Sequence, residues 1–212
     1  MARIRKITRS LSDGKNYYVV DACFLANWAI PADLAPAGPS RDQISACMDW
    51  WKEIEKQLDC DQARVYIPDI CIAETFKVLA KKYYVEKWFT TPTTMNNARR
   101  RLRDFISTPS KVLKGATRRI KFHDISTTRD IIISVDRFYE LFLKSNLGRV
   151  SVPDLILVAT AKYLVDFYDI PTKRLHIVTL DKALRRGSQK IPELPNAYDP
   201  TEPADRASKV FQ

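Results

Sequence analysis

The chain has 212 residues, of which 45% are hydrophobic and 28% charged, and it carries a formal net charge of +10. This length and composition predict one ordinary globular domain with a sizeable core, and they exclude wholesale disorder. They also exclude a membrane helix and a signal peptide, because no apolar run approaches the roughly 20 residues that a bilayer requires and the first residues are basic and polar.

The first part of the chain alternates short strands with helices. In chain order we expect a strand at 16–21, helices at 22–30 and 41–58, a strand at 64–67 and a helix at 69–84. The strand NYYVVD is β-branched and aromatic and ends in Asp21, which is typical of a buried strand that delivers a carboxylate at its C-terminal end. The helix at 69–84 carries Glu74 in its first or second turn.

The second part continues the alternation. We expect a basic amphipathic helix at 97–106, a strand at 120–125, helices at 130–144 and from Asp154 onward, and a strand at 175–179. Strands this apolar, alternating with helices, favour a parallel sheet covered by helices on both sides. The sequence therefore predicts an α/β fold.

Charge and proline mark the boundaries of this domain. Residues 1–15 form a basic N-terminal arm, and residues 188–212, with four prolines and no periodicity, are expected to form a loosely packed or disordered Pro-rich tail. Between them, residues 16–187 form the domain. Within it, residues 92–121 hold nine Lys or Arg and one acid, which predicts a basic helical insertion.

The four cysteines contain no CxxC pair, and the two histidines lie far apart. This pattern indicates neither a zinc site nor a disulfide framework. Reduced cysteines and the absence of a membrane segment lead us to expect a cytoplasmic protein, and the surplus of positive charge favours a polyanionic partner.

Four acids distant in sequence are expected to meet at one edge of the sheet. Asp21 ends the first strand, Asp181 follows the last strand, and Asp154 and Glu74 lie near helix N-termini that reach the same edge. Their mutual repulsion requires cations, and all-oxygen ligands select Mg²⁺ or Mn²⁺. Phosphodiester hydrolysis is the chemistry that such a centre suits.

Each acid also has a purely structural interpretation. Asp154 and Asp181 are at positions typical of helix N-caps, Glu74 is at a position typical of a solvated helix residue, and Asp21 is at a position typical of a turn. Only the combination of all four points to a functional site.

The segments YVVDACFLANW, IPDICIAETF, VPDLILVATAKYL and IVTLDKALRR, in this order, resemble the four motifs of PIN domains. The resemblance implies a three-layer α/β/α sandwich with a central parallel sheet, dependence on Mg²⁺ or Mn²⁺, and hydrolysis of single-stranded or structured RNA to leave a 5′-phosphate. It also implies that Asp21, Glu74, Asp154 and Asp181 are the catalytic, metal-binding quartet and that Thr179 supports it. Cys23 departs from the family, in which many members carry Ser, Thr or Asn.

The basic insertion is a candidate RNA clamp, although a solvated charged helix face is the alternative. Its candidate RNA-binding residues are Arg99, Arg100, Arg101, Arg103, Lys111, Lys114, Arg118 and Arg119. Nearby aromatics, namely Tyr83, Tyr84, Trp88 and Phe89, are candidates for stacking on unpaired bases, with burial in the core as the alternative.

The leading hypothesis is an Mg²⁺- or Mn²⁺-dependent endoribonuclease that binds RNA. The alternatives are a non-catalytic RNA-binding module and the toxin of a toxin–antitoxin pair, which would bind an antitoxin or another protein inhibitor; a homodimer is compatible with each. A phosphatase of the haloacid dehalogenase type is disfavoured, because its nucleophile is followed two residues later by a second Asp and this chain has Cys23 there.

Overall fold

The computed structural model describes residues 14–106, 122–147 and 150–206. In chain order its elements are β1 (Asn16–Val20), α1 (Ala22–Ala29), the 3₁₀ helix η1 (Ala32–Leu34), α2 (Pro39–Asp59), β2 (Ala63–Pro68), α3 (Asp69–Tyr84), α4 (Pro92–Ile106), β3 (Phe122–Ile125), α5 (Arg129–Lys144), α6 (Val152–Tyr168), the 3₁₀ helix η3 (Thr172–Arg174), β4 (Leu175–Val178), α7 (Lys182–Lys190), β5 (Asn196–Tyr198) and α8 (Pro203–Arg206). Among these described segments, no helix combines the length and apolarity needed to cross a membrane.

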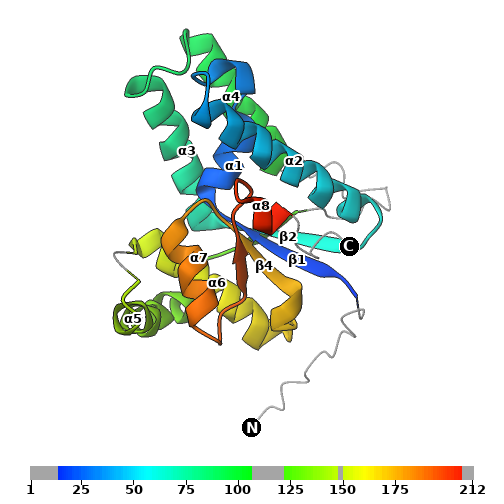
Figure 1. The fold of residues 1–212 in the computed structure, drawn as a ribbon, viewed down its shortest axis with the longest axis vertical. Helices are drawn as coiled ribbons and strands as arrows, with labels where there is room; N and C mark the ends of the chain where they lie inside the picture. The colour runs from blue at the N-terminus through cyan, green and yellow to red at the C-terminus, as the bar shows by residue number, and fades with distance from the viewer. Residues whose placement is uncertain (1–13, 107–121, 148–149, 207–212) are drawn as a thin grey trace.

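The strands form one sheet in the order β3-β2-β1-β4-β5, and every neighbouring pair is parallel. Helices α1 to α4 cover one face and α5 to α7 the other (Figure 1). The expected three-layer α/β/α sandwich is therefore confirmed. Helices α3 and α4 also extend well away from the sheet.

The central strand β1 contributes to a separate hydrophobic core on each face. Tyr18 and Val20 pack with α1, α2 and α4, whereas Tyr17 and Val19 pack with α5, α6 and α7. All four side chains are buried. This alternation follows from the two-residue period of a strand and explains why the whole segment had to be apolar.

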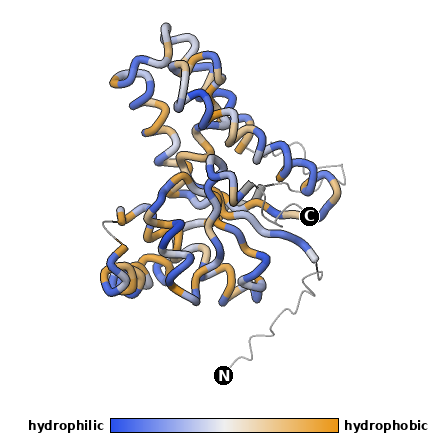
Figure 2. Tube along the Cα trace, in the orientation of Figure 1, coloured by the Kyte–Doolittle hydropathy of each residue, from blue (hydrophilic) through white to orange (hydrophobic). Residues whose placement is uncertain are grey.

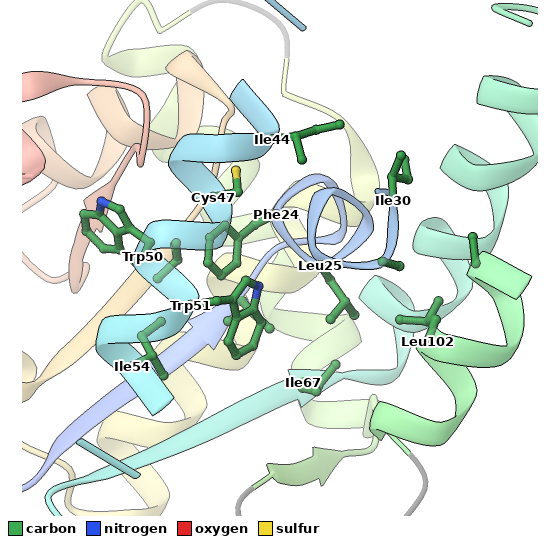
Figure 3. Close-up of a cluster of buried hydrophobic side chains, with 14 of the residues drawn as sticks. Phe24, Leu25, Ile30, Ile44, Cys47, Trp50, Trp51, Ile54, Ile67 and Leu102 are labelled. Atoms are coloured by element: carbon green, nitrogen blue, oxygen red, sulfur yellow. The ribbon is translucent and has the colours of Figure 1, made fainter. Parts of the chain in front are cut away.

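The core between α1 and α2 is built around aromatic rings. Phe24 stacks on Trp51 with 5.0 Å between ring centroids, and Trp51 is 1% exposed (Figure 3). The predicted apolar face of α2 is confirmed, since Cys47, Ile54 and Leu58 are also buried there. Rings of this size supply much of the apolar area that a domain buries.

Helix α4 is longer than the sequence predicted. It begins at Pro92 instead of residue 97, and its buried side is formed by Met95, Ala98 and Leu102. Figure 2 shows the resulting alternation of hydrophilic and hydrophobic residues along this helix. The early turns were missed because only one of their first five residues is apolar. Residues 107–121, with Lys111, Lys114, Arg118 and Arg119, lie outside the described residues.

The prediction of a loose tail at 188–212 is wrong for the part of it that the structure describes. Strand β5 pairs with β4 at the edge of the sheet. Ile191, Leu194 and Ala197 around it are buried. Beyond it, Arg185 donates two hydrogen bonds to Asp205, at 2.8 and 3.1 Å. The apolar residues are single and separated by polar residues and prolines, so no period revealed them.

Gly187 on α7 makes close packing with α5 possible. A Cβ atom at this position would overlap the ring of Phe142, which is itself buried. We expect Gly187→Ala to lower the free energy of unfolding by about 1–3 kcal/mol, because overpacking outweighs the better helix propensity of alanine. Urea denaturation measures this, with Gln189→Ala on the exposed side of α7 as control. Equal stability of the two variants would mean that the ring moves aside without cost.

Candidate functional site

The candidate site lies where the strand order reverses. Strand β1 pairs with β2 on one side and with β4 on the other, and Asp21 follows β1 as Thr179 follows β4. The backbone N–H of Asp21 donates to the carbonyl of Val178 at 3.0 Å, so the two strand ends are held together. In open parallel sheets, ligands bind at the carboxyl ends of the strands at such a reversal.

Asp21 is the buried centre of this edge, with 5% of its surface exposed. Its Oδ1 accepts from the backbone N–H of Ala22, and its Oδ2 accepts from the hydroxyl of Thr179 at 2.9 Å. The Thr179 oxygen in turn accepts from the backbone N–H of Asp181 at 2.9 Å. Thr179 thus connects two of the four candidate acids through one buried hydroxyl.

Asp181 is the N-cap of α7, as its structural interpretation predicts. Its Oδ1 accepts from the backbone N–H groups of Ala183 and Leu184, at 2.6 and 2.9 Å. These bonds satisfy two donors of the helix terminus and fix the carboxylate in place. Within the described part of the chain, no hydrogen bond uses its Oδ2.

Asp154 is not the N-cap of α6, which corrects the sequence-based assignment. Ser151 caps the helix, and Asp154 is the reciprocal third residue of a capping box. Asp154 Oδ2 accepts from the backbone N–H of Ser151 at 3.2 Å and from its hydroxyl. A serine three residues before an acid, ahead of an apolar run, is the signal that would have identified Ser151.

Glu74 reaches the site from α3, which Thr75 fixes against α1. The buried Thr75 hydroxyl lies 2.6 Å from the carbonyl of Cys71 and 3.3 Å from that of Ala22, the residue after Asp21. Glu74 itself is partly exposed and lies 3.9 Å from the ammonium group of Lys77. Glu74 is therefore the acid of the four that the protein holds least rigidly.

The four carboxylates lie close enough together to affect one another's pKa. Burial, with the charges of Asp154 and Glu74, raises the pKa of Asp21 to about 7, against the lowering effect of the Thr179 hydrogen bond. Burial and the charge of Asp154 raise the pKa of Glu74, and burial and the charge of Asp181 raise the pKa of Asp154. A negative charge close to a carboxyl group raises its pKa.

All four acids lie near enough to Cys23 to affect the pKa of its thiol. Its side chain is exposed, yet the surrounding protein atoms and the charges of Asp21, Glu74, Asp154 and Asp181 raise the pKa of its thiol to about 12. Acids up to 160 positions apart in the sequence thus act on one atom. The sequence predicted that all four acids lie at this edge of the sheet, but it did not show how close to one another they lie.

The four side chains are suited to a hard divalent cation by their chemistry, since all of their donor atoms are carboxylate oxygens. They are not arranged as a finished coordination shell. Among the described residues, no three His, Cys, Asp or Glu side chains stand close enough together to hold one ion. The cluster is a concentration of negative charge that a cation would relieve.

The predicted RNA-binding arginines that the structure describes lie on α4. The guanidinium of Arg101 lies 4.7 Å from the ring centre of Trp28 on α1, and that of Arg103 lies 5.9 Å from the ring centre of Phe76 on α3. Arg100 donates to Asn97 at 2.9 Å. Trp28 follows Asp21 by two helical turns, so it lies about 10 Å along α1 from Asp21.

Comparison with known proteins gives fold-level likenesses only. No protein-family model matches the sequence, and no curated protein matches it. VapBC2 from Rickettsia felis, solved bound to a DNA fragment from its promoter, is 11% identical with a TM-score of 0.49, and the match covers 86% of this chain and 98% of that one. FitAcB from Neisseria gonorrhoeae is 14% identical with a TM-score of 0.48, and the match covers 86% of this chain and 97% of that one. The functional assignment rests on this chain's own residues.

Proposed function

We propose that the chain is a divalent-metal-dependent endoribonuclease whose reaction centre is the cluster of Asp21, Glu74, Asp154 and Asp181. The observation that carries this proposal is the convergence of four separated carboxylates on Cys23 at the reversal of the strand order. A protein that concentrates negative charge in this way without matching cations loses stability, so such a cluster is expected to serve a bound cation.

The roles of the acids follow from how each is held. Asp21 is fixed by Thr179, Asp154 by its capping-box hydrogen bonds to Ser151, and Asp181 by the backbone N–H groups of the helix that it caps. These three would bind Mg²⁺ or Mn²⁺, while the less constrained Glu74 would bind a cation or orient the attacking water. When bound, the metal would lower the pKa of that water and stabilise the leaving oxygen.

The choice of RNA as substrate follows from the charge of the chain and from its sequence motifs. A net charge of +10 favours a polyanion, and the resemblance of the four sequence segments to PIN domains favours RNA among polyanions. The exposed arginines of α4 supply cations for the phosphates.

One observation favours a second candidate, a non-catalytic RNA-binding module. In the described residues the four carboxylates are neighbours, but no three of them are close enough together to hold one metal ion. Such a module would bind RNA in a salt-dependent manner and would leave it intact.

Incubation of the purified protein with labelled structured and unstructured RNA separates the two candidates. We expect cleavage products with 5′-phosphates in Mg²⁺ or Mn²⁺ and intact RNA in EDTA. Cleavage that persists in EDTA would overturn the metal mechanism. RNA binding without cleavage in either metal would favour the non-catalytic module.

A further inference from the structure

We propose that single-stranded RNA leaves the carboxylate cluster along the exposed face of α3, where Lys77 and Lys81 contact phosphates and Tyr84 stacks on an unpaired base. We name these three residues the α3 track. This inference rests on the proposed function, since it names the path of the substrate to the same site. It differs from the sequence-based expectation, which placed RNA binding on the arginines of the basic insertion.

The track begins at the cluster and follows one side of the helix. Glu74, Lys77, Lys81 and Tyr84 are separated by three, four and three positions, so they lie along a single face. Lys77 lies 3.9 Å from Glu74, so the first lysine of the track is next to the cluster. From Glu74 to Tyr84 the helix rises about 15 Å, a distance that a few nucleotides can span.

The side chains of the track are available to a ligand. Those of Lys77 and Lys81 are 80% and 66% exposed, and Tyr84 is 63% exposed. Each lysine forms one long ion pair, at 3.9 Å for Glu74 to Lys77 and 3.6 Å for Glu86 to Lys81. Exposed pairs of this kind contribute little to stability, so phosphates can replace them.

The neighbouring residues, by contrast, have structural roles. Trp88 and Phe89 are buried, and Lys82 lies over the Trp88 ring and donates to Glu86 at 2.6 Å. Burial was the alternative considered for all four aromatics of this region, and it is correct for these two. Tyr84 remains exposed, with an edge contact to Tyr83 at 4.7 Å between centroids that orients its ring.

An exposed, oriented tyrosine beside two cations selects unpaired bases. Stacking requires a base whose face is accessible, which a duplex does not offer, while the lysines bind the phosphates of any sequence. The arginines of α4 can contribute phosphate contacts but offer no free ring for stacking, because Arg101 and Arg103 lie over the rings of Trp28 and Phe76. The track therefore predicts preference for single strands without preference for sequence.

Fluorescence anisotropy tests the track separately from catalysis. The probes are a labelled oligouridine and an RNA duplex of equal length, measured in Mg²⁺ with Asp21→Asn as the background so that the RNA stays intact. Into this background we introduce Tyr84→Ala, Tyr84→Phe and the double change Lys77→Ala with Lys81→Ala. Matched controls on α5, across the sheet, are Tyr139→Ala, 47% exposed, and Lys144→Ala, 72% exposed.

We expect Tyr84→Ala to weaken oligouridine binding roughly fivefold to a hundredfold, with duplex binding unchanged, and Tyr84→Phe to retain binding. The double lysine change should make the plot of log affinity against log salt less steep by about 1.4, since two phosphate contacts are lost. The α5 controls should bind as the background does.

The track is overturned if its variants bind like the α5 controls, if Tyr84→Ala weakens duplex and single-strand binding equally, or if the background binds no oligouridine. Failure of the proposed function is a different result. A wild-type protein that binds through the track and cuts nothing would refute the nuclease, whereas cutting with normal binding by the track variants would refute the track.

Discussion

Replacement of Asp21 or Asp154 by asparagine is expected to reduce metal-dependent RNA cleavage by at least about a hundredfold, since several kcal/mol of transition-state stabilisation depend on the bound cation. Asparagine keeps the size of each side chain and removes the charge that attracts the cation. Both residues lie in the cluster, and Asp21 interacts electrostatically with Asp154 and Glu74. Loss of either charge should therefore weaken the centre as a whole.

The matched control is Asp166→Asn on α6. Asp166 lies on the same helix as Asp154, about 18 Å further along, where it is exposed and paired with Lys162. Initial cleavage rates at saturating Mg²⁺ or Mn²⁺ should be unchanged in this control. Cleavage by Asp21→Asn and Asp154→Asn within twofold of the control would show that the reaction does not use these carboxylates.

The stability of the metal-free protein is expected to depend on the protonation of Asp21. The pKa of this carboxyl is raised from an ordinary 3.8 to about 7, chiefly by burial. The folded state therefore binds its proton more tightly than the unfolded chain does. The resulting stability is present in full below about pH 3.8 and is lost as the pH rises through about 7, at a cost of up to about 4 kcal/mol.

Asp21→Asn isolates this contribution, because it removes the titrating carboxyl group and keeps the size of the side chain. At pH 8 without metal the variant should be more stable than the wild type by on the order of 2 kcal/mol, after allowance for one lost hydrogen bond to the Asp21 carboxylate. At pH 4 the order should reverse, with the variant less stable by on the order of 2 kcal/mol, because the wild type has then regained most of the roughly 4 kcal/mol and the non-titrating variant has not changed. Urea denaturation at both pH values measures the difference, and a variant that is less stable at pH 8 would contradict the raised pKa.

Much of the site could be predicted from the sequence because its segments are strongly patterned. Strand β1 is aromatic and β-branched from Tyr17 to Val20, and Asp21 stands directly after it. Helix α3 was predicted with its observed bounds, which placed Glu74 near its start. Parallel strands end at the same edge, so the common location of the acids followed from topology.

The distances between the acids could not be predicted, because they depend on packing between helices. Glu74 approaches Asp21 through the contact of Thr75 with the carbonyl of Ala22, and a local pattern contains no information about that contact. The N-cap of α6 was assigned to Asp154 instead of Ser151, three residues earlier, because both are ordinary capping residues. Strand β5 was missed because three residues are too few to display a period.

The central claim is that Asp21, Glu74, Asp154 and Asp181 together bind a divalent cation. Anomalous X-ray scattering from crystals of the protein grown with Mn²⁺ tests it most directly. We expect an anomalous peak among these four side chains in the wild type, and its loss in Asp21→Asn. Wild-type crystals with no peak at this edge of the sheet, or with an equal peak in the variant, would contradict the account.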